Sequence, residues 1–257
     1  MAFTREGRRR KALAEPFPDR WRALLDGSMA HWRMLDDDER SVLEDHIRVF
    51  LVDKKWQAAR DFELTDEVRV LVSAMASLLI LGLDYECYEN VTWIEVHPTT
   101  VVRTGVRGTG IDNIVSDSPL PILGEAGFDG PVVIAWDAAT ANARHPEHGH
   151  NVVYHEFAHK LDMDDGVVDG TPRLPDPAAR QRWIDVCTRE YELLSEGRGG
   201  ALLDPYGATN PGEFFAVATE LFFDRPTAMQ EHKAELYDVL RDFYRQDPAA
   251  RERRHRG

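Results

Sequence analysis

The sequence predicts an α+β protein that is mostly helical, with a small sheet in the middle third of the chain. Apolar residues recur at helical spacing on both sides of that third. Within it, residues 92–97 alternate as a strand does, and residues 130–136 form a short apolar run bounded by Gly and Pro. Residues that favour helix N-termini stand where several of the helices are expected to begin.

A helical region is expected before the sheet. Asp19 precedes an apolar stripe, and Asp36 followed by three acidic residues is typical of a helix start, where negative charge is favoured. Thr65 predicts the cap of a third helix over residues 66–81, with Gly82 as its stop. The interior of this third helix is nearly all apolar, so we expect it to be buried.

In the rest of the chain, stretches rich in Gly and Pro separate the predicted strands and helices. Residues 99–103 are a possible further strand, and residues 105–130 are expected to form loops. Further helices are predicted over residues 178–195, from Asn210 through Phe223, and over 227–244.

Composition excludes several classes of protein. The net charge of −14 argues against general binding to nucleic acid, which depends on neutralising phosphates. The two cysteines, Cys87 and Cys187, are too few for a disulfide framework and favour a reducing, cytoplasmic compartment. No apolar segment follows the basic residues near the start, and the apolar stretch 68–83 is too short for a membrane span.

The most informative segment is H-E-x-x-H at residues 155–159. In a helix, His155 and His159 lie one turn apart on one face, with Cβ atoms about 6 Å apart. Both imidazoles can then reach one Zn²⁺ at about 2.1 Å, with Glu156 beside the metal as a base. A helix with one polar and one apolar face, here marked by Phe157 and Leu161, is also common without a metal.

A catalytic zinc site needs a third protein ligand. The motif that continues with Gly and a third His is absent, because Asp162 and Asp165 occupy those positions. Asp162 falls one turn after His159, so it is a candidate ligand or a hydrogen-bond acceptor for a ligand histidine, the latter being favoured.

Better candidates for the third ligand lie downstream, in residues 206–223. Glu213 and Glu220 are seven residues apart and share one face of the predicted helix, so either can meet the histidine helix. Glu213 also suits a capping box with Asn210, next to Pro211 at the first helical position. The local sequence supports capping and metal ligation of Glu213 equally.

Two separated blocks, residues 155–162 and 206–216, together resemble the Mlc titration factor A family, bacterial zinc metallopeptidases with a zincin fold. They are also similar to the catalytic domain of anthrax lethal factor. The resemblance covers about residues 16–245. It implies that His155, His159 and Glu213 bind zinc, that Glu156 is the general base, and that Tyr206 stabilises the oxyanion. Without the resemblance, Tyr206 is an ordinary packing residue after Pro205.

The charged ends of the chain and the resemblance together give a predicted division of the chain. A flexible basic N-terminus (1–15) precedes a helical region (16–85) packed on the zincin-like catalytic region (86–247), and a basic tail follows (248–257). Histidines 145, 148 and 150 are more typical of a solvated loop than of a second metal site. The arginines of the tail, which an acidic partner could bind, are more typical of a solvated chain end.

The leading hypothesis is a cytoplasmic, gluzincin-type zinc peptidase, aminopeptidase-like or of broad specificity, which acts on a peptide or protein. The resemblance further implies regulation of sugar uptake through binding of a transcriptional repressor of the Mlc type. The alternative is a non-catalytic regulatory protein that sequesters such a repressor. Neither hypothesis includes direct binding to nucleic acid or to a membrane.

Overall fold

The computed structural model describes residues 4–59, 62–99 and 130–256, and within them the protein is a mostly helical α+β structure, as predicted. The α-helices are α1 (Arg5–Ala14), α2 (Asp19–Ser28), α3 (Ala30–Met34), α4 (Asp37–Asp53), α5 (Asp66–Leu79), α6 (Trp136–Arg144), α7 (Val152–Asp162), α8 (Pro177–Ser195), α9 (Pro211–Asp224), α10 (Pro226–His232), α11 (Ala234–Tyr244) and α12 (Pro248–Arg256). The strands are β1 (Lys55–Ala58), β2 (Trp93–His97) and β3 (Val132–Ala135), and the short 3₁₀ helices are η1 (Tyr85–Tyr88), η2 (Pro146–His148), η3 (Met163–Asp165) and η4 (Pro205–Ala208).

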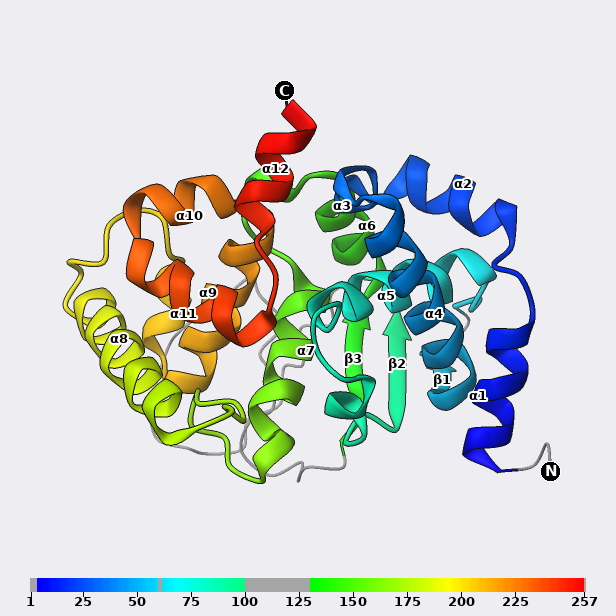
Figure 1. The fold of residues 1–257 in the computed structure, drawn as a ribbon, viewed down its shortest axis with the longest axis horizontal. Helices are drawn as coiled ribbons and strands as arrows, with labels where there is room; N and C mark the ends of the chain where they lie inside the picture. Colours follow the sequence, from blue (N-terminus) through cyan, green and yellow to red (C-terminus); the bar gives the residue numbers. More distant parts are fainter. Residues whose placement is uncertain (1–3, 60–61, 100–129, 257) are drawn as a thin grey trace.

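Helix α7 occupies the middle of the molecule. Figure 1 shows the sheet and the helices α1–α6 on one side of it and the helices α8–α11 on the other. In agreement with this view, α7 contacts β3 and α5 on one side and α9 on the other. The H-E-x-x-H segment is therefore carried by an element whose position is fixed from both halves of the fold.

The sheet is parallel throughout its described strands, in the order β1-β2-β3. Its buried face carries Ile94, Val96, Val132 and Ile134, which are at most 1% exposed. Strands β2 and β3 were predicted, but β1 was not, because the sequence around it has a helical pattern. Only four residues long, β1 is defined by its pairing with β2 more than by its own sequence. The possible strand at 99–103 and the loops at 105–130 lie almost wholly outside the described residues.

Two predicted helix starts are confirmed by their hydrogen bonds. The side chain of Asp36 accepts the backbone N–H of Glu39 at 2.9 Å, and the Glu39 carboxylate accepts the N–H of Asp36 at 3.1 Å. Thr65 caps α5, which is buried along almost all of its length and ends at Leu79, before the predicted stop. These caps satisfy backbone donors that a helix start otherwise leaves without a partner.

The predicted helix over residues 227–244 is two helices, α10 and α11. Lys233 separates them with a non-helical backbone (φ −138°, ψ 49°), and its ammonium group pairs with Glu190 of α8 at 2.7 Å. Helix α6, which follows β3 directly, was also not predicted. Neither feature has a strong local signal in the sequence.

The basic N-terminus, which we expected to be flexible, and the basic tail are both helical within the described residues. Arg9 of α1 pairs with the buried carboxylate of Asp53 at 2.6 Å. Arg251 of α12 is only 5% exposed and binds Glu39 at 2.7 Å. The division of the chain into a catalytic region and accessory segments stays a prediction.

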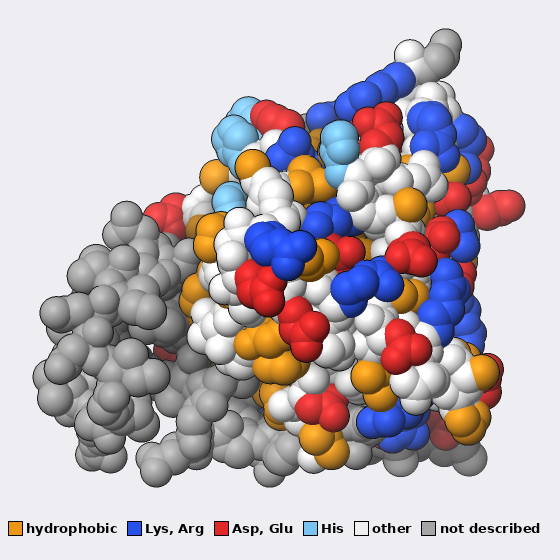
Figure 2. Space-filling view, turned by 90° about the vertical axis from the view of Figure 1, so that its left-hand side faces the viewer, with side chains coloured by type: hydrophobic (Ala, Val, Ile, Leu, Met, Phe, Trp, Pro, Cys, Tyr) orange, Lys and Arg blue, Asp and Glu red, His pale blue; other side chains and the backbone are white. Residues whose placement is uncertain are grey.

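Acidic and basic side chains alternate on the face shown in Figure 2, which is the left-hand side of Figure 1. Several are paired on α8 and α11, among them Arg182 with Asp242 at 2.8 Å and Arg189 with Glu235. This mixture differs from the basic patch typical of proteins that bind nucleic acid. Within the described residues, no helix combines the length and apolar character needed to cross a membrane.

Candidate metal centre

Helix α7 is capped by Asn151, whose side-chain oxygen accepts the N–H of Tyr154 at 3.2 Å. Its apolar face is buried in an aromatic cluster, where the ring of Phe157 lies 5.0 Å from that of Tyr88 and 5.6 Å from that of Phe50. Full burial of such a side chain stabilises the fold by about 1.5–3 kcal/mol. This packing sets the rotation of α7 and so the direction of its polar face.

Helix α9 supplies Glu213, the third candidate ligand. Asn210 caps α9 by accepting the N–H of Glu213 at 3.0 Å, and Pro211 occupies the first turn, as predicted. The Glu213 carboxylate itself faces the histidines of α7 and is 2% exposed. Asn210 therefore caps the helix, whereas the Glu213 carboxylate is directed at the histidines instead of at the backbone N–H of Asn210.

The end of α7 is joined to the start of α9. Asp162 is fully buried and accepts the N–H of Gly170 at 3.0 Å. Gly170 has φ +75°, and a Cβ atom on it would lie 2.3 Å from the carbonyl oxygen of Pro211, so only glycine fits. Asp162 thus fixes the connection between the two helices, and it is not among the described groups that could hold a metal.

Three side-chain atoms converge between α7 and α9. The Nε2 atoms of His155 and His159 are 3.2 Å apart, and Oε2 of Glu213 lies 3.0 Å from the first and 3.4 Å from the second. Ligands in a tetrahedral zinc site with bonds of about 2.1 Å are separated by about 3.4 Å. The triangle is close to this size. Among the described residues, the one group that could hold a metal ion consists of His155, His159 and Glu213, here called the metal group.

The chemistry of the three atoms also fits a cation. The other ring nitrogen of His155, Nδ1, lies 2.8 Å from Oε1 of Glu220, so a proton on Nδ1 leaves a lone pair on Nε2. Oε2 of Glu213 is buried and accepts no hydrogen bond from the described part of the chain. Because buried acceptors that face one another are unfavourable, a proton or a metal ion must lie among them.

The pKa shifts of His155 and Glu213 also indicate that this group of side chains favours a positive charge. Burial would lower the pKa of His155, but the carboxylates of Glu213 and Glu220 outweigh it and raise this pKa. Burial would raise the pKa of Glu213, whereas the adjacent His155 and His159 lower it. The group therefore stabilises a cation beside an ionised carboxylate.

Glu156 is half-buried beside the metal group. Burial raises the pKa of its carboxyl, and so does the charge of Glu213, while His155 and His159 act in the opposite direction. A carboxylate with a raised pKa accepts a proton more readily, as a general base requires.

Tyr206 lies in η4, where its backbone N–H is bound by the side chain of Asp204 at 2.8 Å. Its half-buried ring is 6.0 Å from that of His155. Burial raises the pKa of the phenol, and the nearby carboxylates of Glu213 and Glu156 raise it further. The hydroxyl therefore remains protonated and can donate a hydrogen bond near the metal group.

Glu220 has a function that the sequence did not separate from that of Glu213. Its carboxylate contacts His155 on the side away from the metal group, and it also accepts the N–H of Asn151 at 2.6 Å. The seven-residue spacing between the two glutamates predicted a shared face. Which glutamate meets which ring nitrogen depends on how α7 and α9 pack.

Other candidates from the sequence remain outside the metal group. The rings of His145 and His148 stack at 5.6 Å, and His145 pairs with Glu147, in exposed positions. Cys87 and Cys187 are unbonded, and burial raises the pKa of both thiols, which makes them poor nucleophiles.

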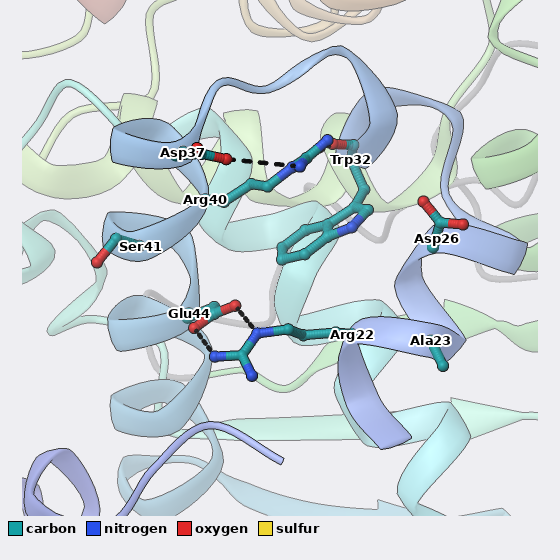
Figure 3. A pocket seen from close by; sticks show the side chains of 8 residues that line it. All are labelled: Arg22, Ala23, Asp26, Trp32, Asp37, Arg40, Ser41 and Glu44. Atoms are coloured by element: carbon teal, nitrogen blue, oxygen red, sulfur yellow. Dashed lines mark hydrogen bonds and ion pairs between the residues drawn. The ribbon is translucent and has the colours of Figure 1, made fainter. Parts of the chain in front are cut away.

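A hollow of about 600 Å³ lies between α2 and α4, away from the metal group. Figure 3 shows that its two arginines are already paired within this chain. Arg22 binds both carboxylate oxygens of Glu44, at 2.6 and 2.8 Å, and Arg40 lies 3.8 Å from Asp37. Because both arginines are already paired, the hollow is a weaker candidate for the chemical site than the metal group, despite its volume.

Comparison with known proteins agrees with the site. The family model described as Glucose-regulated metallo-peptidase M90 matches residues 3–245. An uncharacterised protein of Synechocystis sp. is 36% identical over 246 residues, which cover 94% of this chain and 89% of that protein.

Two further relatives are named Mlc titration factor A. The protein of Pectobacterium atrosepticum is 29% identical over 242 residues, 91% of this chain and 88% of the relative. That of Serratia proteamaculans is 31% identical over 195 residues, 73% of this chain and 72% of the relative. These matches confirm the resemblance inferred from the two sequence blocks, and a metallopeptidase family accords with a group of side chains that could hold a metal. The chain belongs to the glucose-regulated metallo-peptidase M90 family.

Proposed function

We propose that this protein is a zinc-dependent peptidase that acts in the cytoplasm, with His155, His159 and Glu213 as the metal ligands. The observation that carries the proposal is the convergence of two imidazole nitrogens and one carboxylate oxygen within 3.4 Å of one another. Two histidines and a glutamate, with a further position left for water, are typical ligands of catalytic zinc.

Zinc bound there would polarise the scissile carbonyl and acidify the attacking water. The protein's own contribution begins with Glu156, whose carboxylate accepts a proton from that water and delivers it to the leaving amine. The raised pKa of Glu156 suits both steps, because the group must take up the proton and hold it until the C–N bond breaks.

Tyr206 is proposed to stabilise the negative charge that develops on the carbonyl oxygen. Its phenol is held protonated near Glu213, so it can donate a hydrogen bond to that oxygen. Its place in η4, fixed by Asp204, gives the donor a defined position before substrate arrives.

Replacement of Glu156 by Gln tests the general base. The amide has nearly the same shape but cannot accept the proton, so we expect peptide hydrolysis to fall by about 10²–10⁴-fold. Zinc content, measured by elemental analysis, should equal that of the wild type, because Glu156 is not a ligand. Undiminished hydrolysis of a panel of chromogenic peptides would refute the mechanism.

Replacement of Tyr206 by Phe removes the hydroxyl and keeps the ring beside His155. We expect kcat to fall by about 10²–10³-fold, as for loss of one oxyanion donor. Tyr237→Phe is a matched control, since its hydroxyl donates to Asp247 at 2.6 Å rather than to a residue of η4 or of the metal group. Equal kcat values for the Tyr206 variant and the wild type would exclude the oxyanion role.

Replacement of Glu213 by Ala tests the third ligand. The variant should lose most of its zinc after dialysis, because two histidines alone are an incomplete site. Glu190→Ala is the control: Glu190 is 9% exposed and paired with Lys233, but belongs to α8 rather than to the metal group. A Glu213 variant that retains stoichiometric zinc would contradict the assignment.

A second function is proposed from the relatives named Mlc titration factor A. In this proposal the chain binds a transcriptional repressor of the Mlc type and so regulates sugar uptake, with or without peptide cleavage. The net charge of −14 favours such a partner, because a repressor presents a basic surface to DNA. The peptidase itself is proposed to be aminopeptidase-like or of broad specificity.

Capture of a purified Mlc-type repressor separates the two functions. If binding does not depend on catalysis, immobilised Glu156→Gln protein should retain the repressor as the wild type does, because the substitution keeps the surface and the metal. Capture that disappears with Glu156→Gln would show that binding requires the catalytic group. If neither the wild type nor the Glu156→Gln protein captures the repressor, the regulatory proposal is wrong, while the peptidase proposal is unaffected.

A further inference from the structure

Glu220 lies two turns after Glu213 on α9 and is 6% exposed. Its Oε1 atom is 2.8 Å from Nδ1 of His155, and its Oε2 atom accepts the backbone N–H of Asn151 at 2.6 Å. We infer that Glu220 is a positioning residue, which holds His155 in the tautomer and orientation that present Nε2 to the metal. This inference rests on the proposed metal-dependent function.

The carboxylate is suited to this task because it only accepts hydrogen bonds. One of its oxygens accepts the backbone N–H of Asn151, a group that can only donate. The other oxygen then receives the proton of His155 Nδ1, which leaves the lone pair of His155 on Nε2. That lone pair faces Oε2 of Glu213 at 3.0 Å, where the cation is expected.

The two histidines differ in this respect. Nδ1 of His159 is buried and makes no hydrogen bond among the described residues. His159 itself is 3% exposed, so packing restricts its ring without selecting its tautomer. Control of the tautomer by a carboxylate is thus found on the His155 side of the group.

The same carboxylate also joins the two helices that supply ligands. Asn151 caps α7, and Glu220 belongs to α9, so their hydrogen bond fixes the start of α7 against the middle of α9. The distance between His155 and Glu213 then depends on Glu220 as well. The geometry disfavours Glu220 as a direct metal ligand. Oε1 of Glu220 contacts Nδ1 of His155, on the opposite side of the ring from the converging Nε2 atoms.

Glu220→Gln is the decisive variant because it preserves size and can still accept one hydrogen bond. If its oxygen binds the N–H of Asn151, its NH₂ group faces Nδ1 of His155, and the proton of His155 must move to Nε2. In the reverse orientation, NH₂ meets the N–H of Asn151, and two donors oppose each other. Either arrangement weakens the presentation of Nε2.

The measurement is the zinc dissociation constant of the whole chain, obtained by competition with a chromogenic chelator. Glu220→Gln should raise this constant by about 10–100-fold. The visible absorption spectrum of the Co²⁺-loaded protein should also change, because it reports the ligands around the metal. Glu190→Gln, which alters a buried carboxylate on α8 paired with Lys233, should leave both readouts as in the wild type.

Glu220→Asp provides the second variant. It keeps the acceptor-only carboxylate one methylene shorter, so it should recover part of the zinc affinity lost in Glu220→Gln. If Glu220→Gln does not fold, an Asp variant that folds and binds zinc more weakly than Glu190→Gln still supports the inference.

A Glu220→Gln protein with wild-type zinc affinity and an unchanged Co²⁺ spectrum would overturn the positioning role while leaving the metal centre intact. So would an Asp variant with wild-type affinity in the case where the Gln variant does not fold. A wild-type chain that binds neither zinc nor Co²⁺ would instead overturn the proposed function, so the two failures are distinguishable.

Discussion

The fold must hold two imidazole nitrogens and a carboxylate oxygen against one another in a largely dry space. Two imidazole nitrogens and a carboxylate oxygen meet between α7 and α9, and a buried polar group without a partner costs about 1–3 kcal/mol. The surrounding apolar contacts, which stabilise the fold by comparable amounts for each buried side chain, offset this cost and keep the three polar groups together.

This constraint explains why the two helices that carry the proposed ligands are so deeply buried. Residues 212–224 of α9 are all buried, and α7 is enclosed by the sheet, α5 and α9. A glycine that no other residue can replace, Gly170, lets the loop after α7 pass close to Pro211 at the start of α9. Rotation of either helix about its axis would break many of these contacts, so the ligand geometry is specified by the core.

The sequence predicted those parts of the fold and site that have local causes. The caps at Asp36, Thr65 and Asn210 are side-chain hydrogen bonds within a few residues, and periodicity located most helices. Strand β1 was missed because it is defined by its pairing with β2. The break at Lys233 has no strong signal in the local sequence.

The site divides in the same way. The spacing of His155 and His159 is a property of one helix, and the seven-residue spacing placed Glu213 and Glu220 on one face. What each glutamate contacts follows from the relative position of α7 and α9, which no short segment encodes. The roles of Tyr206 and Glu213 came from the resemblance of whole blocks, and the structure adds the distances and charges on which their proposed chemistry depends.

The pairing of Arg251 with Glu39 has a consequence for how the protein is made. These residues are 212 positions apart, and Glu39 also completes the capping box of α4. During synthesis the N-terminal helices leave the ribosome long before α12 exists, so α4 must first form without this contact. The arginine can pair with Glu39 only after residue 251 has been synthesised. Helix α12 can therefore stabilise the start of α4 only after most of the described fold has been synthesised.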